Sequence, residues 1–408
     1  MLIMKKISWK RNLAAIWIGQ ICSTAGTSMT LPFIPIYLRT ELGIADDGAR
    51  AVATSLFFSL GLVSFCASNP IWGALGDKYG RKLMLLRAYF VTAITFPALY
   101  FMPNLFWLLT MRFIASMFSG TVAAAQALTA ATTPDEHQGF ALGALSSSFW
   151  SGNMLGLVAG GVVVHHFGYF VAFMTCGGLF LIGGVLTLLL VEENFVPPIK
   201  KAPVSGKKRK FYLPQFGIAG WMLLILMLLI PVARRCDEPF IPFLVENICG
   251  KAGVELNTSY VNALAALGGI ISGVVFGRLS DRCKPLTLAL PALAIAGTCT
   301  LLQAFITSLP LLMAARFLIF FAVGGLEPIF LAMLSNTVDA DKRGSAFGWS
   351  ASLRVLGGML GALIGGGVVA YLGIRSVFIL AAAMMLGMLL LLVVCIPFIE
   401  RCRNKAEN

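Results

Sequence analysis

The stretch Gly73-Ala-Leu-Gly-Asp77-Lys-Tyr-Gly-Arg81-Lys82 returns 204 positions later as Gly277-Arg-Leu-Ser-Asp281-Arg282-Cys-Lys284. Each copy is a short basic segment between two long apolar stretches. Near the start of the chain the offset is 207 positions, and Pro32-Phe33-Ile34-Pro35 returns as Pro239-Phe240-Ile241-Pro242. The chain therefore consists of two homologous halves, and repeated halves in an apolar chain are typical of secondary transporters.

The composition places these halves in a membrane. The chain is 58% hydrophobic and 12% charged, with a mean hydropathy of +0.86, whereas a soluble domain has about 25% charged residues. Residues 167–191 and 376–399 contain no charged residue, and each stretch is long enough to cross a bilayer as a helix. Because lipid offers the backbone no hydrogen-bond partners, these spans must be helical.

We expect an all-α integral membrane protein with twelve transmembrane helices in two pseudo-symmetric six-helix bundles. The predicted helices cover residues 13–38, 51–75, 83–102, 105–131, 140–165, 169–191, 216–245, 258–279, 286–308, 311–335, 345–371 and 374–399. The predicted domains are an N-terminal bundle (1–196), a basic linker (197–212) and a C-terminal bundle (213–408).

The net charge of +13 is concentrated on one side of the predicted membrane. Most lysines and arginines fall in the termini, the linker and the loops after the even-numbered helices. This asymmetry predicts that both termini face the cytoplasm, in a cytoplasmic (inner) membrane. We therefore expect the run Lys207-Lys208-Arg209-Lys210 to lie near anionic membrane lipids, and no nucleic acid to be a partner.

The sequence gives no sign of catalytic or metal chemistry. Its nine cysteines show no C-x-x-C spacing, and its three histidines suggest no metal site. A phosphate-binding G-x-x-x-x-G-K-[ST] loop is absent, and no nucleophile, histidine and acid form a recognisable set. We expect neither an enzyme nor a cofactor.

The repeated basic segment resembles the loop between helices 2 and 3 of the major facilitator superfamily. Its first copy matches the pattern G-x-L-x-D-x-x-G-R-K, and the resemblance extends over the whole chain. In that family the loop latches the two halves on the cytoplasmic side, so the resemblance implies the major facilitator fold and alternating access. It assigns a conformational role to Gly73, Asp77, Gly80, Arg81, Lys82, Gly277 and Asp281.

Other segments resemble the drug:proton antiporter branch, in particular multidrug resistance proteins of the MdtG type. Arg112, followed eight residues later by Gly120, matches a helix 4 arginine for which a part in proton transfer is proposed, although Arg112 is also near enough to the outer end to reach the surface. The glycines of helix 5, including Gly156, give a flat face that we expect to pack against its counterpart, helix 11. The proline that the branch has after this glycine is Leu157 here, which weakens the resemblance.

Helix 7 has a charged cluster between prolines, Arg234-Arg235-Cys236-Asp237-Glu238. Proline interrupts a helix, and broken helices with charges near the interface of the halves indicate transporter sites. We interpret Arg234 and Arg235 as candidate substrate ligands, and Asp237 and Glu238 as candidate proton-coupling groups. The alternative is an ion-pair network at the outer membrane interface, with Arg234 paired to Asp237 and Glu238.

Glu327 lies deep in predicted helix 10, on the same helical face as Arg316. We interpret Glu327 as a proton-coupling candidate, with Arg354 of helix 11 as its expected cationic partner and a candidate substrate ligand; the alternative is a structural ion pair. Further candidate polar contacts to substrate are Gln20, Gln126, Asn153 and Asn336, although such amides also link helices.

The sequence predicts a monomeric secondary active transporter that exports small amphipathic molecules in exchange for protons. A second hypothesis is transport of a charged metabolite, such as a siderophore or organic anion, including uptake; Arg234, Arg235 and Arg354 favour an anionic or zwitterionic ligand. A third is a non-transporting receptor or a lipid translocase on the same fold. Fold analogy does not decide among them.

Overall fold

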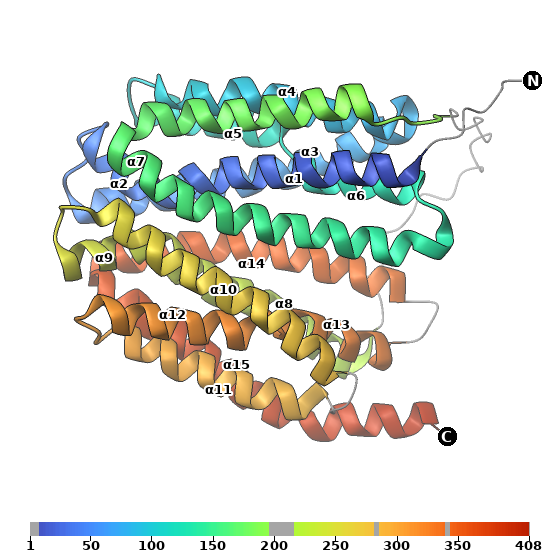
Figure 1. Ribbon diagram of the computed structural model, residues 1–408. Helices are drawn as coiled ribbons and strands as arrows, with labels where there is room; N and C mark the ends of the chain where they lie inside the picture. The colour runs from blue at the N-terminus through green and yellow to red at the C-terminus, as the bar shows by residue number, and fades with distance from the viewer. Residues whose placement is uncertain (1–7, 196–215, 281–284, 339–342, 408) are drawn as a thin grey trace, which may run out of the picture. The chain divides into compact units, whose positions relative to one another are not determined.

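A computed structural model describes residues 8–195, 216–280, 285–338 and 343–407. Within these ranges every regular element is a helix (Figure 1). Nine helical stretches among the described residues are long and apolar enough to cross a bilayer. One of them, the 53-residue α7 (Gln138–Leu190), contains two of the twelve predicted helices, joined at Gly168, where φ is 79°.

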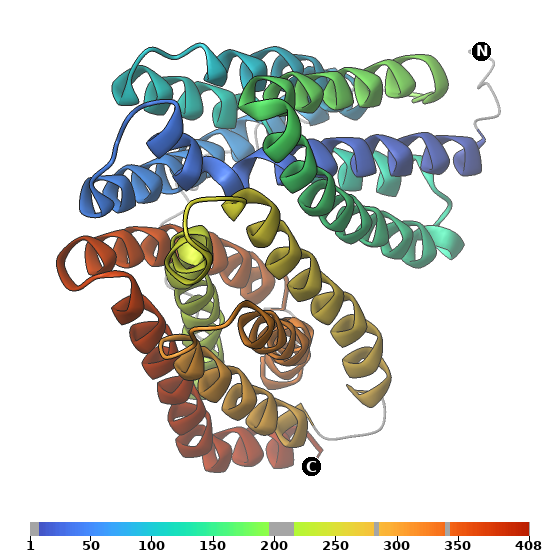
Figure 2. The same ribbon diagram turned by 60° about the vertical axis from the view of Figure 1, so that its left-hand side comes forward.

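The first half of the chain begins with a helix in three parts: α1 (Trp9–Thr30), η1 (Leu31–Phe33) and α2 (Ile34–Thr40). It continues with α3 (Asp47–Tyr79), α4 (Arg81–Tyr100), α5 (Leu105–Phe118), α6 (Thr121–Thr132), η2 (Asp135–His137) and α7. The second half repeats this order with α8 (Gly217–Asp237), η3 (Glu238–Phe240), α9 (Ile241–Cys249), α10 (Val254–Ser280), α11 (Pro285–Gln303), α12 (Leu309–Gly324), α13 (Leu326–Thr337), α14 (Arg343–Leu372) and α15 (Ile374–Glu407). In the second half α12, orange in Figure 2, packs against α10 and α11.

Two compact units differ slightly from the halves of the sequence. The first unit comprises Met1–Tyr37 and Leu60–Arg209, and the second comprises Leu38–Ser59 and Lys210–Asn408. The segment Leu38–Ser59, which holds the first part of α3, thus packs with elements of the second half. One reason is a close approach: a Cβ on Gly366 of α14 would collide with the Ser55 side chain of α3. The predicted division at the linker 197–212 stays a prediction.

The helices are broken at equivalent places in the two halves. The 3₁₀ turns η1 and η3 follow α1 and α8 at the repeated Pro-Phe-Ile-Pro segments, where proline removes a backbone donor. The fourth helix of each half is also divided, into α5 and α6 at Gly120 and into α12 and α13 at Gly324-Gly325. Gly120 has a φ of 112°, which an L-residue rarely adopts. These breaks leave helix ends inside the units, next to the polar residues described below.

The helix 5 glycines pack differently from our expectation. Cβ atoms on Gly156 and Gly160 of α7 would lie 2.2 Å from the Ala25 carbonyl and 2.6 Å from the Met29 carbonyl of α1. The expectation that this face meets helix 11 is wrong, because α1 already fills it. The equivalent glycines of α14 face α8 in the same way: a Cβ on Gly361 would lie 2.4 Å from the Val232 carbonyl. Small residues let each pair of backbones meet closely within its own half.

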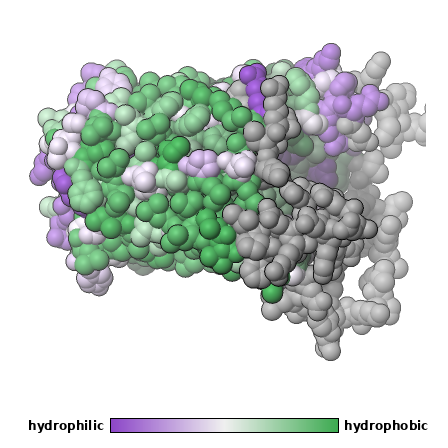
Figure 3. Space-filling model, turned by 90° about the horizontal axis from the view of Figure 1, so that it is seen from below, coloured by the Kyte–Doolittle hydropathy of each residue, from purple (hydrophilic) through white to green (hydrophobic). Residues whose placement is uncertain are grey.

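The outer surface is suited to lipid. On the face seen in Figure 3, hydrophobic side chains cover most of the described surface, and hydrophilic ones gather at the left edge and at the upper right. Large apolar side chains such as Leu189 and Leu390 are exposed, as expected of helices whose solvent is hydrocarbon.

Candidate functional site

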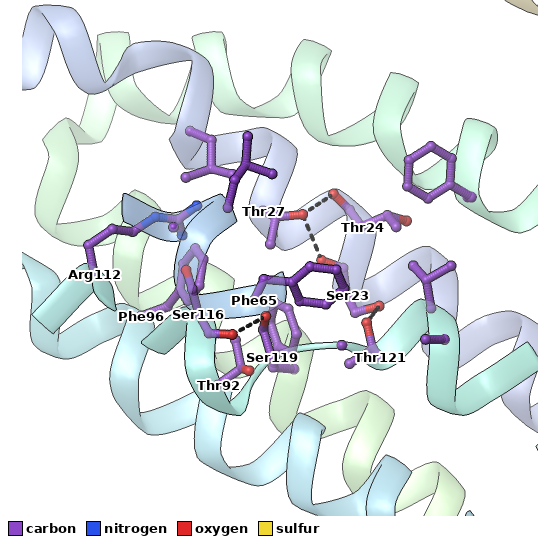
Figure 4. A pocket seen from close by; sticks show the side chains of 18 residues that line it. Ser23, Thr24, Thr27, Phe65, Thr92, Phe96, Arg112, Ser116, Ser119 and Thr121 are labelled. Atoms are coloured by element: carbon purple, nitrogen blue, oxygen red, sulfur yellow. Dashed lines mark hydrogen bonds between the residues drawn. The ribbon is translucent and has the colours of Figure 1, made fainter. Parts of the chain in front are cut away.

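A cavity of about 270 Å³ lies in the first unit, where α5 ends and α6 begins. Seven hydroxyl side chains from α1, α4, α5, α6 and the break between the last two line it: Ser23, Thr24, Thr27, Thr92, Ser116, Ser119 and Thr121. Four phenyl rings complete much of the wall: Phe65, Phe96, Phe149 and Phe180. Figure 4 shows the hydroxyls of α1 and those of α5 and α6 around the same space. We call it the hydroxyl cavity.

Arg112 of α5 is the only charged residue among those that line the hydroxyl cavity in the described chain. Its guanidinium lies over Gly61 of α3, where a Cβ would come within 2.8 Å of Arg112 Nε, and lies 5.8 Å from the Phe96 ring centroid. Glycine at position 61 therefore makes room for the guanidinium. The Arg112 side chain lines the cavity. The alternative considered from the sequence, that it reaches the outer surface of the membrane, is not what the structure shows.

The second unit places an ion pair in its interior. Arg316 Nη1 of α12 donates to Asp237 Oδ2 at 2.8 Å, and the two side chains are 1% and 5% exposed. The guanidinium carbons of Arg234 and Arg316 lie 4.7 and 4.9 Å from the ring centroid of Phe320. The helix 7 cluster is thus tied to helix 10, and Asp237 pairs with Arg316 in place of the Arg234 considered from the sequence.

The two arginines in repeat-equivalent positions have different surroundings. Arg316 corresponds to Arg112, but Asp237 corresponds to Thr30, whose hydroxyl bonds to the Thr27 carbonyl at 3.3 Å. The duplication therefore gave one half a buried acid–base pair and the other a cavity of hydroxyls with a single arginine. Arg235 and Glu238 form a separate, more exposed pair at 3.4 Å.

Glu327 forms an ion pair with Arg354 of α14, the cation that the sequence suggested. Glu327 lies in the first turn of α13, directly after the Gly324-Gly325 break. Its side chain is 49% exposed and that of Arg354 34% exposed, so this pair is far more open than the pair of Arg316 and Asp237. Arg316 pairs with Asp237 although it shares a predicted helical face with Glu327.

The remaining predicted polar contacts do not gather in one place. Asn153 accepts a hydrogen bond from Ser28 at 2.6 Å, which links α7 to α1. Gln20 is buried in α1 and Gln126 is exposed on α6; neither is among the residues that line the hydroxyl cavity. The side chain of Asn336 lies outside the described residues.

The predicted latch loop is held by a residue that the sequence did not single out. Gly80, with a φ of 103°, precedes α4, and the Glu193 carboxylate accepts hydrogen bonds from the backbone N–H groups of Arg81 at 2.9 Å and Lys82 at 2.8 Å. A carboxylate is favourable there because the first N–H groups of a helix have no partner in the helix. Asp77 is 71% exposed and lies 3.8 Å from Arg81. Of the second copy, Gly277 lies in α10 and Asp281 outside the described residues.

A second group that the sequence analysis missed joins α9 to α2 and to the start of α3. Glu246 of α9 pairs with Arg39 of α2, and at 3.1 Å with Arg50 of α3, which is 3% exposed. Arg50 also lies 4.1 Å from the Phe243 ring centroid. Arg39 and Glu246 occupy equivalent positions in the duplication, which is the one signal that could have paired them from sequence.

Comparison with known proteins identifies the family of this architecture. A profile described as Major Facilitator Superfamily matches residues 16–247 and 223–406. The chain is 30% identical over 383 residues to multidrug resistance protein MdtG of Klebsiella pneumoniae, covering 93% of this chain and 92% of that protein. It is also 30% identical over 383 residues to a multi-drug resistance efflux pump PmrA homolog of Lactococcus lactis, with 92% of each chain covered.

Solved structures share the fold at lower identity. The nucleoside transporter NupG superposes with a TM-score of 0.73 at 13% identity, covering 94% of this chain and 98% of that one. The POT family transporter PepTSo gives a TM-score of 0.75 at 12% identity, with 97% and 99% covered. Together with the duplicated helices and the repeated loop, these matches show that the chain is a membrane transporter that belongs to the Major Facilitator Superfamily.

Proposed function

We propose that this transporter exports small amphipathic compounds in exchange for protons, by alternating access. The observation that supports proton coupling is the pair of acid–base contacts beside helix breaks in the second unit: Asp237 with Arg316, and Glu327 with Arg354. Charges within membrane spans are costly and are functional by default. The efflux pumps at about 30% identity support export.

The two pairs suit different steps of a coupled cycle. Glu327 is half exposed, so water and protons can reach its carboxylate, and a proton there removes the charge that holds Arg354. Asp237 is enclosed with Arg316 and can exchange a proton only when α8 and α12 separate. Proton binding and helix packing are therefore linked at both places, which a coupled transporter requires.

The proposal includes the identity of the membrane and the orientation of the protein in it. The excess of lysine and arginine on one side supports a cytoplasmic membrane with both termini in the cytoplasm. The protein would work as a monomer in contact with anionic lipids, with a small molecule and protons as its ligands.

The test uses proteoliposomes with a pH-sensitive dye inside and a panel of cationic, zwitterionic and anionic amphipathic compounds outside. We expect compound-dependent proton movement in the wild type, loss of it in Glu327→Gln, and no change in Glu255→Gln, a carboxyl variant in the first turn of α10. Compound movement without protons would refute the coupling. Saturable binding of a compound without any transport of it would favour a receptor. Transport of the compound only into the cytoplasmic side would favour uptake.

A further inference from the structure

The hydroxyl cavity has a positive end. The residues Gly120 to Ala123 line it, so the N-terminus of α6 opens into the cavity. Gly120 is the N-cap of α6 and offers no side chain to the first N–H groups of this 12-residue helix. Unsatisfied N–H groups and the helix dipole attract anions at such an end, and broken transporter helices use it for anionic groups of their substrates. The Arg112 guanidinium adds a full positive charge to the same cavity.

Thr92 gives independent evidence that a polar ligand belongs there. Its side chain lines the cavity from α4 and is 1% exposed. Its Oγ1 has no hydrogen-bond partner among the described residues. Because buried hydroxyls nearly always have a partner, this one is available to a bound acceptor.

The α1 side of the cavity offers hydrogen-bond acceptors and so favours a donor group of the ligand. Thr24 and Thr27 donate their hydroxyl protons to backbone carbonyls of their own helix, at 2.6 Å to Gln20 and 3.0 Å to Thr24. Their oxygens keep lone pairs that can accept from a ligand. The cavity therefore contains groups that bind anions and groups that accept hydrogen bonds, and phenyl rings are also part of its lining.

We propose that the hydroxyl cavity binds the carboxylate of an amphipathic substrate that has an N–H or O–H donor near it, as in N-substituted amino acids. Arg112, the α6 N-terminus and Thr92 bind the carboxylate, and the α1 hydroxyls accept from the neighbouring donor. A cationic group finds no carboxylate among the described residues of the lining. This proposal rests on the proposed transport function and gives Arg112 a ligand-binding role in place of proton transfer.

The size of the cavity fits one end of such a compound. Its volume of about 270 Å³ lies just below the range of roughly 300–1,000 Å³ for pockets that enclose a drug-sized ligand. It can hold a carboxylate, its donor neighbour and part of one ring.

Three fluorescent compounds with the same ring system provide the test. Dansylglycine has a carboxylate beside a sulfonamide N–H, dansylglycinamide is its neutral equivalent, and N-dansylethylenediamine is cationic. In fluorescence titrations of the purified full chain, we expect dansylglycine to bind at least tenfold more tightly than either of the others. Arg112→Gln should remove this preference, and Arg112→Lys should restore part of it.

Thr92→Val provides a second readout with a matched control. It removes the cavity hydroxyl at nearly constant volume, and we expect it to weaken dansylglycine binding several-fold while leaving the amide unaffected. Thr95→Val removes another buried hydroxyl of α4 that also lacks a partner among the described residues but is not part of the lining. It should leave binding of all three compounds unchanged.

Equal affinity of the acid and the amide in the wild type, or no binding of the acid, would overturn the proposal. Equal effects of Thr92→Val and Thr95→Val would do so as well. These results would not refute the proposed function, because proton-coupled transport of other compounds could persist. Conversely, a carboxylate preference without proton movement would support the cavity assignment and refute the coupling.

Discussion

Arg316 is a large charged side chain on the membrane helix α12, and it is almost fully buried. Asp237 is its only ion-pair partner in the described structure. Taking a charged pair out of water is costly, and removing one member leaves the other uncompensated. At the scale of single residues, the pair therefore constrains the stability of the second unit, and in the proposed transport cycle it also binds and releases a proton. These two roles can be separated by changing one or both members.

We expect Asp237→Asn to destabilise the protein by about 3–5 kcal/mol, because it leaves the Arg316 guanidinium without a counter-charge. The double variant Asp237→Leu/Arg316→Met should recover most of this loss while abolishing proton movement. Thermal unfolding in detergent measures the first effect and the dye assay the second. Arg235→Ala is the control, since its half-exposed pair with Glu238 should contribute less than about 1 kcal/mol. A double variant as unstable as the single one would contradict this explanation.

At the scale of elements, the contact of α1 with α7 shows how glycine determines helix packing. Gly156 meets the backbone of α1 so closely that a methyl group at this position would overlap the Ala25 carbonyl. Gly143 belongs to the same helix, but a methyl group there would enter open space, with no packing neighbour within 4 Å. The same substitution at the two positions therefore separates packing from helix propensity.

Gly156→Ala should lower stability by about 1–3 kcal/mol, because α1 and α7 must move apart to accommodate the methyl group. Gly143→Ala should be neutral or stabilising by about 0.5–1 kcal/mol, since alanine is the better helix former. Thermal unfolding of the two variants side by side checks this. Equal shifts for both would mean that the close contact has no energetic role.

At the scale of the whole molecule, the loop between α3 and α4 is a candidate for controlling the transport cycle. Asp77 is largely exposed beside Arg81, while Glu193 holds the N-terminus of α4. Asp77 is thus available to a partner in another state, as the resemblance of this loop implies.

Asp77→Asn should reduce turnover while ligand affinity stays within about threefold, which is less than about 1 kcal/mol. It should also leave the unfolding temperature nearly unchanged, because an exposed ion pair contributes little. Initial rates in proteoliposomes and equilibrium titrations of the same preparation test both points. Normal turnover, or a large loss of affinity, would show that Asp77 is not a conformational latch.

Glu246 joins segments from the two homologous halves of the sequence within the second unit. Glu246→Gln should destabilise this unit by about 1–3 kcal/mol, because Arg39 and the buried Arg50 lose their shared negative charge and one of the two acceptor oxygens becomes an NH2 donor. Glu41→Gln removes an exposed carboxylate from the same region and should have no measurable effect. The unfolding temperatures of the two variants test this prediction. Equal values would mean that the Glu246 ion pairs do not stabilise the fold.

The sequence by itself determined the twelve helices, the duplication and the repeated basic loop, and it predicted the break at the prolines of helix 7. Each of these follows from local chemistry: apolar stretches long enough for a bilayer must be helical, and proline interrupts them. Even the pair of Glu327 with Arg354 could be suggested, because few charges lie inside the spans and their choices of partner are limited.

Only the tertiary structure decided which groups meet across the chain. Arg316 and Asp237 are 79 residues apart, whereas the sequence placed Arg316 on one helical face with Glu327. The break at Gly324-Gly325 makes α12 and α13 separate helices, so a regular helical face does not extend from Arg316 to Glu327. The glycine face of α7 meets α1, and the hydroxyls of the cavity come from several helices, for the same physical reason: periodicity defines the faces of a helix, but packing selects the partner of each face.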